Sequence, residues 1–193
     1  IDKKVILVSD LHAAGKEVAR NDSASLIDMG DGVLLYEFHA KMNAIDTEII
    51  TLYEKAIDLL DADRYTGLVV ANQGGTAFSA GANLFAVLMA ASMKQWAMLE
   101  DMVRRLQVVC QRAKYSRRPV VTAPWGRTLG GGGEIALQSS ATQAAGELYM
   151  GQVEAGVGVA DPEAVVGAGP VPGEVRWRLA GGQAEPHEAG GDL

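Results

Sequence analysis

The chain has 193 residues, of which 48% are hydrophobic, and a formal net charge of −7 at pH 7. This length allows one domain with a buried core, and the acidic balance argues against a nucleic-acid-binding surface. The single cysteine, Cys110, excludes a disulfide framework and predicts a reducing compartment. Because neither a long apolar run nor a signal pattern is present, we expect a cytoplasmic protein without a membrane span.

The first segment, residues 1–24, contains one apolar run among polar positions and predicts a connector with a docking element rather than a domain. Because the chain opens with Ile1 in place of methionine, we expect it to be a piece of a longer polypeptide or a processed product. Two β-rich runs, 25–29 and 33–38, then flank a Gly-Asp-Gly turn, and they predict a β-hairpin.

A helical period follows the hairpin. Apolar residues recur at helical spacing after Asp46, which can cap a helix that ends before the apolar run 67–72. That run predicts a short buried strand, and the small residues of 73–82 predict a loop. Residues 84–115 predict one long amphipathic helical region, where repeated methionines favour adaptable core packing.

The alternation of helices and strands continues in the next part of the chain. Residues 118–123 predict a second buried strand with a proline at its edge, the glycine run 130–133 predicts a loop, and 134–143 predict a helix. This order predicts an α/β domain whose site lies on the loops at strand ends. The tail, 159–193, is rich in Pro and Gly without an apolar period, so we expect it to be poorly ordered.

The most informative motif is the run of four glycines, 130–133, followed directly by Glu134. Glycines remove the side chains that would keep a ligand away from backbone N–H groups, and a helix start adds further unpaired donors. A merely flexible turn is the alternative, and the spacing disfavours a dinucleotide-binding fingerprint. A second small-residue loop, within 77–84, also joins a strand to a helix, so we expect two donors to converge on one oxyanion.

Other reactive residue types favour structural roles. Cys110 lies in an apolar run and is expected to be a small core residue rather than a nucleophile. The basic cluster 114–118 predicts a solvated helix end or, alternatively, a contact to an anionic ligand such as a phosphate. His12, His39 and His187 lack neighbouring metal ligands in the sequence, so we propose no metal site.

Four blocks of the sequence, taken in order, resemble the signature of the crotonase superfamily, the enoyl-CoA hydratases and isomerases. The blocks are 42–44, 77–84, 119–121 leading to 129–137, and 149–154. The resemblance covers residues 25–158. Residues 38–46 and 123–126 are most similar to the crotonase domain that lies C-terminal to the dehydrogenase in fused bacterial 3-hydroxyacyl-CoA dehydrogenases.

The resemblance implies a ββα spiral fold and a coenzyme A thioester as substrate, with no permanently bound cofactor. It assigns the backbone N–H groups of Ala82 and Gly131 to an oxyanion hole that polarises the thioester carbonyl. Glu134 and Glu154 then occupy the two carboxylate positions of hydratases, one activating water and the other protonating the α-carbon. We expect partial desolvation to raise the pKa of both carboxyl groups. The resemblance also implies a coenzyme A path lined by Lys41, Ala44, Ser79, Ala80 and Ala82.

The predicted activity is that of an enoyl-CoA hydratase-type lyase in fatty-acid β-oxidation. Isomerisation, thioester hydrolysis and a catalytically impaired acyl-CoA-binding or assembly module remain alternatives. The alternative for Glu134 is an acid favoured by the helix dipole, and the alternative for Glu154 is a surface acid; the joint occurrence of the blocks favours the catalytic interpretation of both.

The sequence departs from the family pattern after Gly158. We therefore expect a crotonase-like core, 25–158, that is truncated at its C-terminus and lacks the helices that cover the acyl pocket in the family. The expected partners are an acyl-CoA substrate, a dehydrogenase domain or subunit, and further copies of the chain, since the family forms trimers.

Overall fold

The structure, a computed structural model, describes residues 6–152. Its helices are α1 (Val8–Ala13), the 3-10 turn η1 (Lys41–Asn43), α2 (Thr47–Asp61), α3 (Leu84–Ser92), α4 (Trp96–Lys114) and α5 (Gly131–Leu137). Its strands are β1 (Glu17–Arg20), β2 (Ala24–Gly30), β3 (Val33–Phe38), β4 (Gly67–Val70), β5 (Ala77–Ser79), β6 (Val120–Thr122), β7 (Gly126–Leu129), β8 (Ala141–Thr142) and β9 (Leu148–Gly151). Within this range, no helix is both long and apolar enough to cross a membrane.

Two sheets organise the described part of the chain. The larger sheet has the order β1-β2-β3-β4-β6-β8, and the smaller sheet has the order β5-β7-β9. After the antiparallel β2–β3 hairpin, the described strands pair in parallel. From β4 onwards, each turn of the chain adds a strand to the larger sheet, then a strand to the smaller sheet, then helix. This is the ββα spiral that the resemblance implies.

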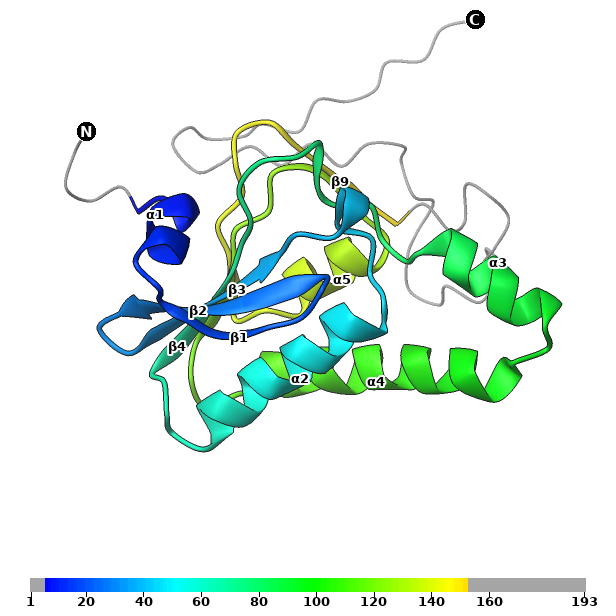
Figure 1. The fold of residues 1–193 in the computed structure, drawn as a ribbon, viewed down its shortest axis with the longest axis horizontal. Helices are drawn as coiled ribbons and strands as arrows, with labels where there is room; N and C mark the ends of the chain where they lie inside the picture. Colours follow the sequence, from blue (N-terminus) through cyan, green and yellow to red (C-terminus); the bar gives the residue numbers. More distant parts are fainter. Residues whose placement is uncertain (1–5, 153–193) are drawn as a thin grey trace, which may run out of the picture.

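The β2–β3 hairpin presents its two faces to different layers. Leu26, Leu34 and Tyr36 belong to the main core with α2, whereas Ile27 and Leu35 belong to a smaller cluster with α1. Successive side chains of a strand point to opposite faces, so the antiparallel register of this hairpin determines both layers. The helix α1 therefore covers the sheet face opposite to α2 and α4 (Figure 1).

The start of α2 is as the sequence predicts. The Asp46 carboxylate caps the helix by accepting a hydrogen bond from the Ile49 N–H at 2.9 Å. The same carboxylate accepts a bond from the Ser23 hydroxyl at 2.6 Å, which joins the helix start to the β1–β2 turn. Buried Tyr36 donates to the Ile49 carbonyl at 2.5 Å, so β3 also holds the first turn of α2.

Three predicted boundaries are wrong. The loop predicted over 73–82 contains β5, which is too short to show a strand period in the sequence. The helical region predicted over 84–115 is divided into α3 and α4, because Lys94 adopts a φ of 57°, which an α-helix cannot continue. The helix predicted over 134–143 begins earlier, at Gly131, and ends at Leu137 before β8.

The segment predicted as a connector contributes to the larger sheet. Its residues 17–20 form β1, which pairs antiparallel with β2 and makes one edge of that sheet. The proposed division of the chain at residue 24 stays a prediction, and the sheet begins before it. The tail 159–193 lies outside the described residues.

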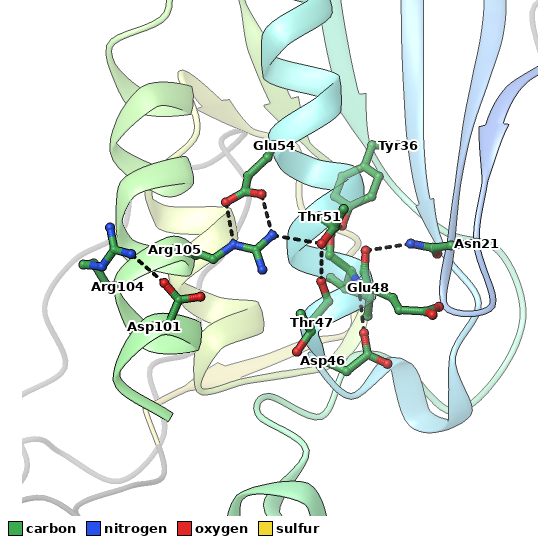
Figure 2. A network of polar contacts seen from close by, with 11 residues as sticks. Asn21, Tyr36, Asp46, Thr47, Glu48, Thr51, Glu54, Asp101, Arg104 and Arg105 are labelled. Carbon is green, nitrogen blue, oxygen red and sulfur yellow. Dashed lines mark hydrogen bonds and ion pairs between the residues drawn. The ribbon is translucent and has the colours of Figure 1, made fainter. Parts of the chain in front are cut away.

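Arginine–carboxylate pairs join α4 to α2. Arg105 donates to Glu54 from Nε at 3.0 Å and from Nη2 at 2.6 Å, and Nη2 also donates to the Thr51 hydroxyl at 2.9 Å (Figure 2). Two turns further along α4, Arg112 contacts Asp58 at 2.6 Å. Hydrogen bonding to Glu54 raises the pKa of the Arg105 guanidinium, so this cation stays charged at all ordinary pH values.

We expect Arg105→Gln to lower the free energy of unfolding by about 1–2 kcal/mol. The substitution breaks a bidentate ion pair with Glu54, and the two side chains are only 24% and 29% exposed. Arg104→Gln is the matched control. Arg104 is 65% exposed and contacts Asp101 within its own helix, so its loss is expected to cost less than about 0.5 kcal/mol. Urea unfolding measures both values, and equal costs would contradict the role given to Arg105.

Candidate functional site

The turns that follow β5 and β7 lie at the same edge of the smaller sheet, because these strands are parallel neighbours. Ser79 pairs with Thr128 in the register. Ala82 lies three residues beyond Ser79, and Gly131 lies three residues beyond Thr128. Because both residues lie three positions beyond a paired residue, the two predicted oxyanion donors occupy neighbouring positions at this edge of the sheet.

The two turns touch through their backbones. Gly81 has a φ of +84°, and a Cβ on it would stand 2.9 Å from the Leu129 carbonyl oxygen. Gly130 has φ 49° and ψ −124°, a conformation that is essentially restricted to glycine. A Cβ on Gly132 would stand only 2.5 Å from the Cβ of Ser79. Glycine at these positions therefore permits the close approach.

The amides of Ala82 and Gly131 have no protein acceptor within residues 6–152. Ile45 donates to the Gly81 carbonyl at 2.7 Å and accepts from the Asn83 N–H at 3.0 Å, so it bonds on either side of Ala82. The Ala82 N–H therefore points away from Ile45. Gly131 opens α5, where the first N–H groups lack an intrahelical acceptor. Within the described residues, neither amide is thus committed to a protein acceptor.

The glycine run is helical, which corrects the predicted loop. Three of its glycines form the first turn of α5, and β7, which the sequence did not predict, precedes them. Gly131, Gly132 and Gly133 are all buried against other elements, so packing overrides the low helix propensity of glycine here. The unpaired N–H groups predicted at this point are the helix's own first donors.

Glu134 lies in the first turn of α5, and its Oε2 stands 3.8 Å from where a Cβ on Gly131 would be. The residue is exposed, and the partial desolvation predicted for its carboxylate stays a prediction. A pocket of about 330 Å³ lies beside it. The pocket is lined by Glu134 together with Leu106, Gln107, Cys110, Gln111 and Gln138.

Glu154 lies outside the described residues, but the strand that leads to it is described. The Gly130 N–H donates to the Gly151 carbonyl at 3.0 Å, and the Gln152 side-chain amide donates to the Gly130 carbonyl at 3.4 Å. The end of β9 thus lies against the turn that precedes Gly131.

Four of the five residues expected along the coenzyme A path lie on adjoining turns. Lys41 and Ala44 belong to the η1 turn and its end, and the Ala80 N–H donates to the Met42 carbonyl of that turn at 3.1 Å. Lys41 and Ala82 are exposed, and Ala44 and Ala80 are half-buried. This placement leaves a surface open to a ligand, and the coenzyme A path itself stays a prediction.

Ser79, the fifth residue, is fully buried. Its hydroxyl donates to the Asn43 carbonyl at 2.8 Å and accepts from the Gly81 N–H at 3.2 Å. The described contacts of this side chain are therefore internal to the protein.

Asn72 and Trp125 form a pair that supports the site and that the sequence did not predict. The Asn72 side chain donates to the Phe78 carbonyl at 2.9 Å and accepts from the Trp125 ring N–H at 2.7 Å. Asn72 follows β4 and Trp125 follows β6, so the pair joins the two crossovers between the sheets. The sequence signal that could have predicted this pair is the position of both polar side chains just after a predicted parallel strand.

Two histidines have partners on the outer face of the larger sheet, away from the two turns. His12 Nε2 lies 2.8 Å from the Glu37 carboxylate, and His39 Nε2 lies 3.0 Å from the Ser25 hydroxyl. Among residues 6–152, no group of three or more His, Cys, Asp or Glu side chains is arranged to hold a metal ion. These histidines are thus held by hydrogen bonds.

Comparison with known proteins identifies the family. The sequence model described as Enoyl-CoA hydratase/isomerase matches residues 32–163, which is more than half of the chain. The chain belongs to the enoyl-CoA hydratase/isomerase family. The order of blocks that resembles this family in the sequence is therefore matched by the fold and by the family model.

Individual relatives agree with this family. The chain is 44% identical over 158 residues, 82% of its length, to the Bacillus subtilis (strain 168) protein named "Probable 3-hydroxyacyl-CoA dehydrogenase". It is 32% identical over 150 residues, 78% of its length, to a Rickettsia prowazekii (strain Madrid E) protein named as a fatty acid oxidation complex trifunctional enzyme. Each match covers 20% of the relative, so the chain spans about a fifth of their length.

A solved structure shows the same fold. An enoyl-CoA hydratase/isomerase from Xanthobacter autotrophicus Py2 matches with a TM-score of 0.61 and 25% identity, over 70% of this chain and 51% of that chain. The ββα spiral of residues 6–152 is thus the fold of this family.

Two glycine substitutions test the close approach of the turns. Gly132→Ala would force a Cβ to 2.5 Å from Ser79, so we expect the free energy of unfolding to fall by about 1–3 kcal/mol. Gly133→Ala meets nothing closer than 3.6 Å and removes a flexible residue from a helix, so we expect a gain of up to about 1 kcal/mol. Urea unfolding compares the two, and a stabilising Gly132→Ala would contradict the packing described.

Cys110 is buried, as predicted for a core residue, and burial together with the charge of Glu134 raises the pKa of its thiol to about 12. The thiolate fraction of the native chain is therefore small at neutral pH, whereas the unfolded chain ionises near the ordinary value of 9.0. We expect thiol modification of the native chain to be far slower at pH 9 than that of the urea-unfolded chain.

A substitution at Glu134 tests separately how much its charge contributes to the pKa of the Cys110 thiol. Removing a negative charge favours the thiolate, so Glu134→Gln is expected to lower the Cys110 pKa and shift the rate profile to lower pH. Glu100→Gln, an exposed position at the other end of α4, serves as the control and leaves the profile in place. A native rate equal to the unfolded rate would contradict the burial of Cys110.

Proposed function

We propose that this chain catalyses the hydration of trans-2-enoyl-CoA thioesters to 3-hydroxyacyl-CoA in fatty-acid β-oxidation. One observation supports the proposal most strongly: the available amides of Ala82 and Gly131 lie on touching turns, with Glu134 in the first turn beyond. Membership of the enoyl-CoA hydratase/isomerase family supports the same chemistry.

The reaction needs a site that stabilises an oxyanion and two groups that transfer protons. When the oxygen of water bonds to the β-carbon, the electron pair of the double bond moves towards the α-carbon and the thioester oxygen. Two N–H donors at about 2.7–3.1 Å stabilise the enolate oxygen that forms. One carboxylate takes the proton of the attacking water, and the second, as the acid, gives its proton to the α-carbon. We assign the donors to Ala82 and Gly131 and the carboxylates to Glu134 and Glu154.

Chain connectivity supports the role of Glu154. Glu154 follows Gly151 by three residues, and three peptide units span at most about 11 Å. Gly151 is itself hydrogen-bonded to Gly130, next to the proposed donor Gly131. The proposed second carboxylate thus belongs to a residue three positions along the chain from a strand end that is bonded to this turn.

The relatives suggest a partner for the reaction. The hydration product, a 3-hydroxyacyl-CoA, belongs to the substrate class in the name of the Bacillus subtilis relative, of which this chain matches a fifth. We propose that the chain works beside a dehydrogenase domain or subunit, in the cytoplasm, with coenzyme A bound along Lys41, Ala44, Ala80 and Ala82. A homotrimer is the proposed assembly.

A second candidate is an acyl-CoA-binding module without turnover. The exposure of Glu134 favours it, because oxyanion stabilisation weakens where water has access to the reacting groups. The two candidates differ in turnover and share the binding of acyl-CoA.

Crotonyl-CoA hydration, followed by loss of the enoyl absorbance, tests the proposal. We expect the chain to be active and Glu134→Gln and Glu154→Gln each to lower kcat by at least about 100-fold, because each removes a proton-transfer group. Glu100→Gln, an exposed glutamate on α4, controls for the loss of one negative charge and is expected to keep the activity.

The other outcomes separate the alternatives. Activity that survives Glu154→Gln and not Glu134→Gln would indicate a reaction with one carboxylate, such as isomerisation. Binding of acetyl-CoA in a calorimetric titration without hydration of crotonyl-CoA would indicate the binding module, and neither binding nor turnover would contradict both candidates.

A further inference from the structure

Ser79 is buried where the two turns meet. It ends β5, its side chain is fully enclosed, and its hydroxyl forms two hydrogen bonds. One runs to the Asn43 carbonyl at 2.8 Å and the other comes from the Gly81 N–H at 3.2 Å. On a third side, a Cβ on Gly132 would stand 2.5 Å from the Ser79 Cβ and 2.8 Å from its hydroxyl oxygen.

The contacts of Ser79 bracket both proposed donors. Gly81 directly precedes Ala82, and Gly132 directly follows Gly131. The bond to the Gly81 N–H holds the peptide one step before the Ala82 amide, while the contact with Gly132 sets how closely α5 approaches. One side chain thus touches the immediate neighbours of both amides.

Asn43 anchors Ser79 from the other side. Asn43 has a left-handed backbone with φ 49°, and its buried side-chain amide donates to the Ala77 carbonyl at 3.0 Å. Together with the Ser79 hydroxyl on the Asn43 carbonyl, this joins the η1 turn to both ends of β5. The Ser79 hydroxyl is therefore held in one orientation, with its lone pair directed at the Gly81 N–H.

We propose that Ser79 is a positioning residue of the oxyanion hole: its hydroxyl orients the Ala82 amide, and its Cβ sets the spacing between that amide and Gly131. The inference rests on the proposed function. It gives Ser79 a role different from the expected place along the coenzyme A path, because the enclosed side chain has no surface to offer a ligand.

A positioning role has a kinetic signature. The enolate oxygen is more negative than the substrate carbonyl, so a displaced donor weakens the transition state more than the bound ground state. Coenzyme A binding uses other parts of the surface. A change at Ser79 is therefore expected to lower kcat with little change in KM, whereas a purely structural loss lowers the amount of folded protein.

Ser79→Ala in the full 193-residue chain removes the hydroxyl, and Ser25→Ala is the matched control. Ser25 is also fully buried, and its hydroxyl also has two partners, Glu17 at 3.2 Å and His39 at 3.0 Å, on the outer sheet face. We expect Ser79→Ala to lower kcat for crotonyl-CoA by about 10- to 100-fold with KM within about 3-fold. Ser25→Ala is expected to keep the wild-type kcat.

The absorbance of a bound chromophoric thioester measures the polarisation of its carbonyl by the oxyanion hole without turnover. A dimethylaminocinnamoyl-CoA thioester absorbs further to the red when its carbonyl is polarised. We expect the wild-type chain and Ser25→Ala to give the red shift and Ser79→Ala to give a smaller one. A wild-type chain with neither shift nor hydration would overturn the proposed function and this inference with it. A wild-type chain that shows both, while Ser79→Ala keeps both unchanged, would overturn the inference alone.

Ser79→Cys covers the case in which circular dichroism shows that Ser79→Ala is unfolded. A thiol forms weaker hydrogen bonds than a hydroxyl and has a similar shape, so we expect a folded protein with kcat and red shift below the wild-type values. Wild-type values of both in Ser79→Cys would overturn the inference.

Discussion

The parallel pairing of β5 with β7 and of β7 with β9 is the constraint on which the site depends. The pairs Ser79 with Thr128 and Leu129 with Gly151 bring the ends of three strands to one edge of the smaller sheet. Each strand end leads to a residue of the proposed site: Ala82, Gly131 and Glu154. Residues far apart in the sequence, such as Gly81 and Leu129, are thereby neighbours.

The rest of the molecule holds that edge in place. The larger sheet and the core on α2 supply most of the buried apolar side chains, while the Asn72–Trp125 pair joins the crossovers to the smaller sheet. Packing of glycine against Ser79 brings the two turns into contact at the cost of helix propensity in α5. Most of the apolar burial thus lies away from the two turns, where the amides of Ala82 and Gly131 have no protein acceptor within residues 6–152.

The sequence predicted the larger elements because their signals are local. The hairpin, the Asp46 cap and the buried strands β4 and β6 follow from apolar runs and capping chemistry. The strands of the smaller sheet were not predicted, because glycine or polar residues interrupt their short segments and leave no apolar run such as those of β4 and β6. The two oxyanion donors and the two glutamates were predicted from the resemblance to a family. The burial of Ser79 and the exposure of Glu134 depend on register and packing, which no local pattern contains.

A crystal structure of the chain with an unreactive acyl-CoA thioester bound measures the central claim most directly. The predicted result is one thioester oxygen within about 2.7–3.1 Å of the amide nitrogens of both Ala82 and Gly131. An oxygen that contacts only one of these amides, or a thioester bound at another edge of the sheets, would contradict the oxyanion hole and the reaction assigned to it.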